Sequence, residues 1–203
     1  MKKEQVLARM KEDCLVAVVR AKNYEQGEKV VDAIIAGGIN FIELTMTMDD
    51  GDPVGFIKLM AEKYKGNDKI VIGAGTVLDP ETARACILAG ANYIVSPGLN
   101  VDTIRLCNRY RVPMLPGVMT PSEAITAMEA GADIIMLDNM SPAEMAEAIR
   151  IIDGRAETEC SGNMTIENIK TITALGVDYV SSGALTHSAP ILDISLKNLH
   201  AVE

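Results

Sequence analysis

Eight short apolar segments, each followed by a stretch with helical spacing, restrict the fold of this chain more than any other feature. Most of these segments are continuous runs of Val, Ile, Leu, Met and Ala rather than alternations, which is typical of parallel strands covered on both faces. Helical patterns of about 10–15 residues separate them. The expected strands are 15–20, 41–46, 70–77, 93–98, 113–118, 133–137, 156–161 and 179–183.

Two recurring sequence patterns support a repeated strand–helix unit. Before four of the strands a helix ends at glycine, in IIAGGIN, ILAGANY, MEAGADI and ITALGVD. After four strands a helix-capping residue precedes an acidic one, with Asp79, Thr120, Ser141 and Thr165 as the predicted caps. The pattern predicts a single parallel (βα)8 TIM barrel over residues 1–203, with short loops. An open doubly wound sheet is the alternative.

Length, charge and cysteine usage limit the classes of protein to which this chain can belong. At 203 residues the chain suits one domain. A net charge of −9 without a basic cluster argues against a nucleic-acid partner. No apolar run approaches the roughly 18 residues of a membrane span, and the charged N-terminus does not resemble a signal peptide. We therefore expect a cytoplasmic protein without a membrane partner, whose four widely spaced cysteines are buried apolar residues.

Functional groups of such barrels gather at the carboxyl ends of the strands. The last two strands end in SGN (161–163) and SGA (182–184), where small residues let backbone N–H groups approach an anion. We predict a cup for phosphate or sulfate there. Its candidate residues are Ser161, Gly162, Asn163, Gly183, Ala184 and His187. Tight turns without a ligand, and a surface or capping role for His187, are the alternatives.

Charged residues at other strand ends are further candidates. Arg20 and Glu43 end neighbouring strands, so they form either a structural ion pair or a substrate and acid–base pair. Asp138 and Glu159 end the sixth and seventh strands. They could share Mg²⁺, although two carboxylates are few for a metal site and solvated strand ends are the simpler reading. No cofactor is required by the sequence, and Mg²⁺ is a possible one.

From Met1 to about Ala132 the chain resembles the 2-keto-3-deoxy-6-phosphogluconate and 4-hydroxy-2-oxoglutarate aldolases. The similar segments are VAVVRA, AGGINFIELTMT, IGAGTVLDPE, YIVSPGLN and MLPGVMTPSEA. The resemblance implies that Glu43 is the general acid/base and that Arg20 and Thr76 hold the substrate carboxylate and carbonyl end. Pro97, in the fourth segment, is a further candidate substrate contact.

The sixth strand departs from that family. The resemblance implies a Schiff-base lysine within a segment like IIKLFP, whereas this chain has IIMLDN (134–139), with Met136 in the lysine's place. A thioether cannot form an imine, so the nucleophile for carbon–carbon bond cleavage is missing.

From about Ala132 onward the chain instead resembles the C-terminal barrel part of quinolinate phosphoribosyltransferase. The segments are ADIIMLDNMSPAEMAEAIR, ECSGNMTIENI and GVDYVSSGALTHSAPILDISLK. This resemblance places Asp138 near the metal and the phosphoribosyl donor, and Ser161, Gly162, Asn163 and Gly183 in the phosphate cradle with His187 nearby. We therefore interpret the chain as a chimera, engineered or recombined, of residues 1–132 and 133–203, with its seam within about 129–136.

Three function hypotheses follow. The first is a chimeric barrel that keeps a phosphate cup but has lost aldolase activity. The second is a working aldolase that uses an unrecognised lysine or a metal-stabilised enolate, and the third is a phosphoribosyltransferase remnant. Expected partners are a small phosphorylated or 2-keto-acid molecule and a second copy in a homo-oligomer.

Overall fold

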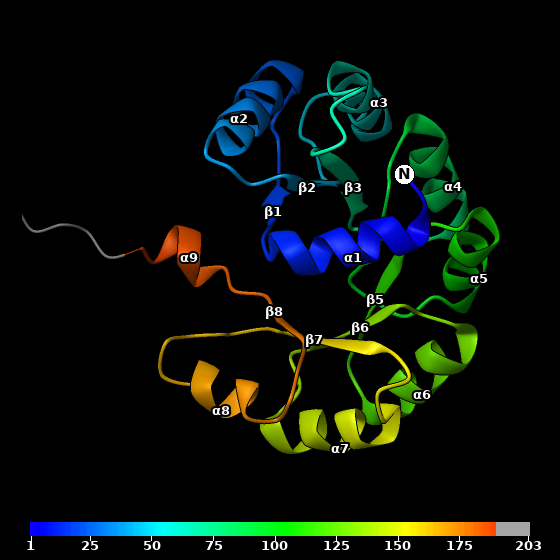
Figure 1. The fold of residues 1–203 in the computed structure, drawn as a ribbon, viewed down its shortest axis with the longest axis vertical. Helices are drawn as coiled ribbons and strands as arrows, with labels where there is room; N and C mark the ends of the chain where they lie inside the picture. The colour runs from blue at the N-terminus through cyan, green and yellow to red at the C-terminus, as the bar shows by residue number, and fades with distance from the viewer. Residues whose placement is uncertain (190–203) are drawn as a thin grey trace, which may run out of the picture.

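A computed structural model describes residues 1–189 of the chain. Eight parallel strands follow one another in sequential order within one sheet, and helices cover its outer side (Figure 1). Each strand lies within or overlaps one of the eight predicted segments, so the predicted strand count is confirmed. The strands are β1 (Val16–Val19), β2 (Phe41–Thr45), β3 (Val71–Gly75), β4 (Ile94–Ser96), β5 (Met114–Val118), β6 (Ile134–Asp138), β7 (Glu157–Ser161) and β8 (Tyr179–Val180).

One helix precedes the first strand and one follows each strand. Three predicted caps are confirmed, because Asp79, Thr120 and Ser141 each accept a hydrogen bond from a backbone N–H in the first turn of α4, α6 and α7. The helices are α1 (Lys3–Asp13), α2 (Tyr24–Ala36), α3 (Pro53–Lys63), α4 (Pro80–Ala89), α5 (Val101–Tyr110), α6 (Pro121–Ala130), α7 (Pro142–Ile152), α8 (Ile169–Thr173) and α9 (Ala184–His187).

Helix α8 is much shorter than the sequence pattern predicts. The predicted cap Thr165 does not begin a helix: its backbone N–H donates to Asn168 Oδ1 at 2.8 Å, and α8 starts only at Ile169. The side-chain amide of Asn168 also donates to the Asn163 carbonyl at 2.9 Å. This turn uses the residues that would otherwise form the first helical turn, which leaves α8 with five residues. Helix α9, after β8, has four.

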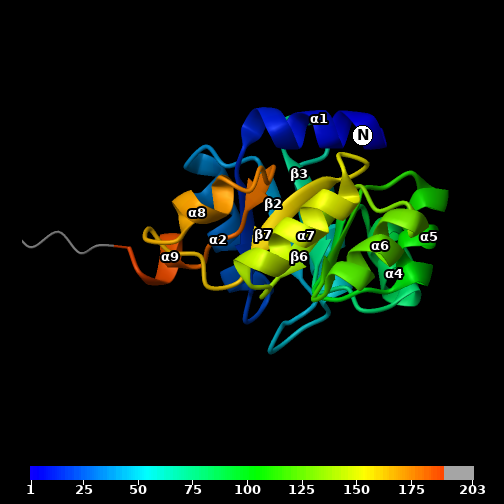
Figure 2. The ribbon, with the colours of Figure 1, turned by 90° about the horizontal axis from the view of Figure 1, so that it is seen from below.

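Helix α1 closes the amino-terminal end of the sheet. Its buried residues Val6 and Met10 pack with residues at or near the starts of strands, including Phe41, Tyr93 and Ile134. In the view of Figure 2 this helix lies across one end of the strands. The opposite, carboxyl-terminal ends are therefore the end at which loops can build a site.

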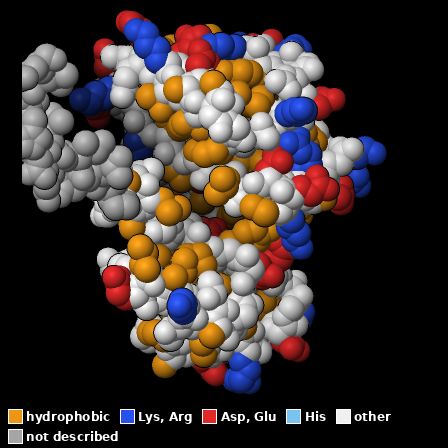
Figure 3. Space-filling model, turned by 60° about the vertical axis from the view of Figure 1, so that its left-hand side comes forward, with side chains coloured by type: hydrophobic (Ala, Val, Ile, Leu, Met, Phe, Trp, Pro, Cys, Tyr) orange, Lys and Arg blue, Asp and Glu red, His pale blue; other side chains and the backbone are white. Residues whose placement is uncertain are grey.

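The strands do not close into a barrel, which corrects the prediction of a closed TIM barrel. Within residues 1–189 no strand pairing joins β8 to β1, and β8 pairs with β7 at only two positions. The sheet is instead a half-barrel. Val16 and Val18 stand level with Phe41 and Glu43 of β2 and have exposed fractions of 39% and 48%. Figure 3 shows hydrophobic side chains on this side of the molecule, beside a hollow.

The number of matched positions varies along the sheet: β5 and β6 share Gly117–Met136 and Val118–Leu137, and β3 and β4 share only Ala74–Ile94. The neighbouring β6–β7 pair has five matched positions. Residues Cys86, Cys107 and Cys160 are buried as predicted, whereas Cys14 is exposed. In the described part of the chain, no helix is both long and apolar enough to traverse a bilayer. Residues 190–203, including the end of the second resemblance, lie outside the described residues.

Candidate active site at the carboxyl ends of the strands

Polar side chains from β2, β6 and β7 lie on the concave face of the half-barrel. Phe41 and Ile134 belong to the inner cluster beneath α1, and strand side chains alternate between faces. Glu43 and Met136, two residues further along, therefore face inward as well. The register places Glu159 level with Met136 and Ser161 level with Asp138.

Glu43 is the inward carboxyl group whose surroundings most favour proton transfer. Burial, reinforced by the negative charge of Glu159, raises its pKa to about 7, while Arg20 opposes the shift. Gly75 provides the space, because a Cβ built there would lie 1.8 Å from Glu43 Oε1. A carboxyl group with a pKa near neutrality can both accept and return a proton at pH 7.

The other predicted substrate contacts lie around Glu43. Arg20 follows β1 and is exposed; no ion pair within 4 Å joins these two described residues, although its charge acts on Glu43. Thr76 follows β3, is half-buried and has φ of 60°. Pro97 follows β4 and is exposed, and its carbonyl oxygen would lie 2.5 Å from a Cβ at Gly117. The structure thus brings Arg20 near Glu43 and places Thr76 and Pro97 at the same end of the sheet.

Met136 occupies the inner face where imine chemistry needs a lysine. Its Cε would lie 3.1 Å from a Cβ at Gly117, so the side chain packs across β5. None of the eight strands contains a lysine. The inner face of the described sheet therefore offers carboxylates and a thioether, but no strand-borne amine.

Asp138 and Glu159 do not form a metal site with a third ligand. Within residues 1–189 there is no group of three His, Cys, Asp or Glu side chains suited to a metal ion. The Asn139 amide donates to Asp138 Oδ2 at 3.0 Å, and the Ser181 hydroxyl donates to Glu159 Oε1. Because Mg²⁺ is commonly held by one or two carboxylates with water completing its coordination, metal binding by Asp138 and Glu159 stays a prediction.

The predicted phosphate-cup residues lie on two adjoining loops. The hydroxyl of Ser182 donates to the Met164 carbonyl at 3.1 Å and connects the loops that follow β7 and β8. Gly162 and Asn163 have positive φ values of 95° and 52°. Among the described residues, no backbone acceptor takes the N–H groups of Gly162, Asn163, Gly183 or Ala184 outside regular elements. These donors are available to an anion.

His187 is exposed to solvent and lies close to Gly183. Its Nε2 would lie 2.9 Å from a Cβ at Gly183, and its Nδ1 is 2.7 Å from Ser188 Oγ. Because α9 has only four residues, its N-terminus adds little positive potential. Any anion at this position depends mainly on individual backbone N–H groups.

Two side chains of the inner face, Tyr93 and Ser181, were not singled out from the sequence. Tyr93 is fully buried beside Gly73, and the Ser181 hydroxyl donates to Glu159. Gly73 and Gly75 belong to β3. The signal in the sequence was the presence of small residues within a strand. Such residues indicate that large side chains approach the strand closely.

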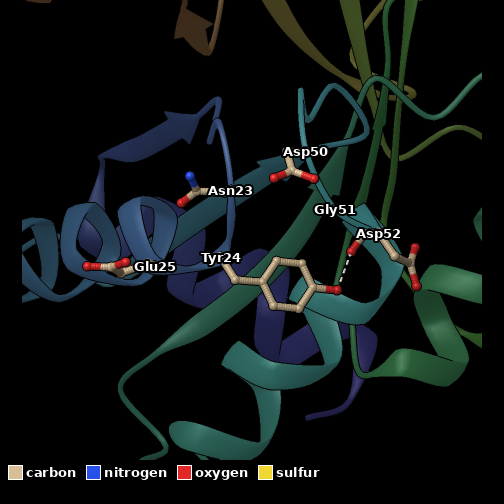
Figure 4. A pocket seen from close by; sticks show the side chains of 6 residues that line it. All are labelled: Asn23, Tyr24, Glu25, Asp50, Gly51 and Asp52. Carbon is tan, nitrogen blue, oxygen red and sulfur yellow. Dashed lines mark hydrogen bonds between the residues drawn. The ribbon is translucent and has the colours of Figure 1, made fainter.

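Two hollows lie away from the inner face. The first, of about 430 Å³, lies between the loops after β1 and β2, and Figure 4 shows its six lining residues. Asn23 and Asp52 cap α2 and α3, and the Tyr24 hydroxyl donates to the Asp52 carbonyl at 2.7 Å. Its polar groups thus serve local structure. The second, of about 760 Å³, lies beside α1.

Curated relatives from two enzyme groups share part of this sequence. The KHG/KDPG aldolase of Escherichia coli is 30% identical over 117 residues, covering 58% of this chain and 53% of the relative. A probable nicotinate-nucleotide pyrophosphorylase (carboxylating) of Archaeoglobus fulgidus is 38% identical over 119 residues, covering 56% of this chain and 46% of the relative. The chain thus spans about half the length of these relatives.

Solved structures and a family model point to the aldolase fold. The native KDPGal structure is 26% identical with a TM-score of 0.70, over 83% of this chain and 82% of that one. The family model for KDPG and KHG aldolase matches residues 6–186, which is most of the sequence. This chain therefore belongs to the KDPG and KHG aldolase family.

Proposed function

We propose that this protein binds a small phosphorylated 2-oxo acid but does not cleave it through an imine. The observation that carries the proposal is the inward-facing Met136, which lies between Gly117 and Glu159 with no lysine on any strand. The E. coli KHG/KDPG aldolase and 2-dehydro-3-deoxy-6-phosphogalactonate aldolase, which are similar over parts of the chain, support this substrate class. A homo-oligomer belongs to the proposal as well.

The two ends of such a substrate suit different parts of the site. Its phosphate would meet the backbone donors of Gly162, Asn163, Gly183 and Ala184. Its 2-oxo and carboxylate end would lie by Arg20, Thr76 and Glu43, with Pro97 at the rim. Glu43 would exchange a proton at the carbon next to the carbonyl, since its pKa near 7 permits both directions of transfer.

We also infer that the sequence joins elements of two barrel families near residues 129–136. The parallel similarity to aldolases and to nicotinate-nucleotide pyrophosphorylases supports this inference. A phosphoribosyltransferase remnant is the less favoured alternative, because the site carries Glu43 as the aldolases do.

A working aldolase is the second candidate, favoured by Glu43 and by the aldolase family to which the chain belongs. Borohydride reduction with pyruvate, followed by intact-mass measurement, separates the two. We expect no reduced pyruvyl adduct on the unchanged chain. Met136→Lys, whose amine would enter a site flanked by Glu159, should form one adduct, and Met136→Gln serves as the control for size and polarity.

Turnover gives the second measurement. Cleavage of 2-keto-3-deoxy-6-phosphogluconate by the unchanged chain should stay near background, far from the roughly 1–10³ per second of ordinary enzymes. An adduct on the unchanged chain, or turnover at an ordinary rate, would show that another nucleophile works here and would overturn the proposal.

A further inference from the structure

The inner face of β1 is apolar and partly exposed. Val16 and Val18 stand level with Phe41 and Glu43 of β2, and their exposed fractions are 39% and 48%. Phe41, the neighbour of Val16, is fully buried. Leu15, directly before the strand, has an exposed fraction of 54%. Three large aliphatic side chains within four positions are thus in contact with water, beside the hollow seen in Figure 3.

The sequence of β1 contains none of the features that normally protect the edge of a sheet. Edge strands of natural proteins carry charges, prolines or bulges that prevent pairing with other chains. Strand β1 reads VAVV (16–19), and within the described part of the chain no strand pairs with its free side, the side opposite β2. An apolar edge without such protection predicts a cover that residues 1–189 do not supply.

The chain continues for 14 residues beyond the described part, and their sequence suits this edge. Residues 192–197 read LDISLK, in which apolar and polar residues alternate strictly. Such alternation is typical of a segment with one face against a protein core and the other in water. Residues 192, 194 and 196 form the apolar set of this segment, and residues 193, 195 and 197 form its polar set.

The described chain ends on the open side of the sheet. Helix α9 follows β8, and in Figure 1 it lies to the left of both β1 and β8, where the sheet is open. Fourteen residues reach up to about 46 Å when extended, whereas a gap that takes one further strand is about 10 Å wide. The chain after Ala189 is therefore long enough to run along β1.

A segment of the same chain has an advantage over a second molecule at this edge. A short linker makes the encounter intramolecular, with an effective concentration in the millimolar range. A separate molecule instead loses its translational and rotational freedom when it associates. The same apolar contact is therefore more favourable when residues 192–197 of the chain itself supply it.

We propose that residues 192–197 dock along the free side of β1, with their apolar set against Val16 and Val18 and their polar set in water. Because Val18 stands level with Glu43, the docked segment also shields this side of the concave face from water. The contact does not depend on the proposed ligand. A segment held at one edge opens locally, so β1 remains less protected than the inner strands.

Methyl NOEs in the full-length chain test the contact directly. With Ile, Leu and Val methyl groups labelled, NOEs should connect Val16 or Val18 with Ile194 or Leu196. In a second sample, labelled chain is mixed with an excess of unlabelled chain, and the NOEs should keep their intensity per labelled chain. Absence of these NOEs would overturn the proposal. Their loss on mixing would overturn it as well, because a second copy would then occupy the edge.

Amide exchange of β1 gives an independent measurement. Ile194→Ser should speed the exchange of the β1 amides at least about tenfold, because a large apolar contact is lost. Asp193→Ser is the matched control from the polar set of the same segment, and it should leave these rates in place. Both positions lie outside residues 1–189, so neither variant alters the described core. Equal β1 exchange rates in the two variants would contradict docking through the apolar set.

Discussion

Glu43 combines an inward position, a glycine beneath its carboxyl group and a second carboxylate across the half-barrel. Each of these features penalises the charged form, and Arg20 offsets only part of the penalty. The sequence predicted the position of Glu43, because an acidic residue within an apolar strand is conspicuous. It did not predict that the charge of Glu159 acts on Glu43, because the two residues are 116 positions apart in the sequence.

The raised pKa of Glu43 makes stability depend on pH. Between the ordinary value of 4.5 and about 7 the folded chain binds more protons than the unfolded one, so this group lowers stability as pH rises through that window. At pH 8, Glu43→Gln should be more stable than the unchanged chain, by up to about 3 kcal/mol. Urea denaturation at pH 5 and pH 8 measures the difference.

Glu147→Gln provides the control for that measurement, because Glu147 pairs with Arg150 on the exposed side of α7. Its effect should be small and the same at both pH values, because the pair is exposed to solvent. If Glu43→Gln were less stable than the unchanged chain at pH 8, burial of a charged carboxylate would not be the destabilising feature described above.

At the scale of helices and strands, the sequence predicts the start of a helix best where several signals agree. For α4, α6 and α7 the cap, the proline of the first turn and the acidic residue all support the same start. For α8 the same pattern is misleading, because the Asn168 side chain bonds to both Thr165 and Asn163. An asparagine that satisfies backbone groups in a turn competes with the helix, and this competition is decided by geometry.

The turn around Asn168 belongs to the loop that supplies half of the proposed phosphate cup. Because backbone N–H groups rather than a long helix hold the anion, we expect modest affinity that falls with salt, and the net charge of −9 opposes anions further. A phosphate titration followed by ¹H–¹⁵N NMR should show saturable shifts at Gly162, Asn163, Gly183 and Ala184 in the millimolar range.

Gly183 permits a direct test of this cup. It has an ordinary φ of −70°, so a side chain is tolerated by the backbone and meets only the tip of His187. Gly183→Leu should abolish the shifts while the fold persists, and Gly183→Ala should weaken them less. Absence of saturable shifts in the unchanged chain would exclude a phosphate site on these loops.

At the scale of the whole molecule, the sequence predicted the number and order of strands but not the gap between β8 and β1. Apolar runs and helical spacing are the same for a closed and an open sheet of parallel strands. Closure depends on how far β8 extends alongside β1, and β8 spans only two residues. Val16 and Val18, which would face the interior of a closed barrel, are consequently exposed.

The gap between β8 and β1 should be visible in the rates of native-state hydrogen exchange. Amides buried in paired strands exchange only through large openings, whereas strands at an edge exchange through local ones. Amides of β1 and β8 should therefore exchange orders of magnitude faster than those of β3 and β5, whose residues are all buried. Strand β7 is the control, because it adjoins β8 but is paired on both sides. Since pairing between β8 and β1 would protect both strands at once, protection of β1 and β8 as strong as that of β7 would demonstrate a closed barrel in solution.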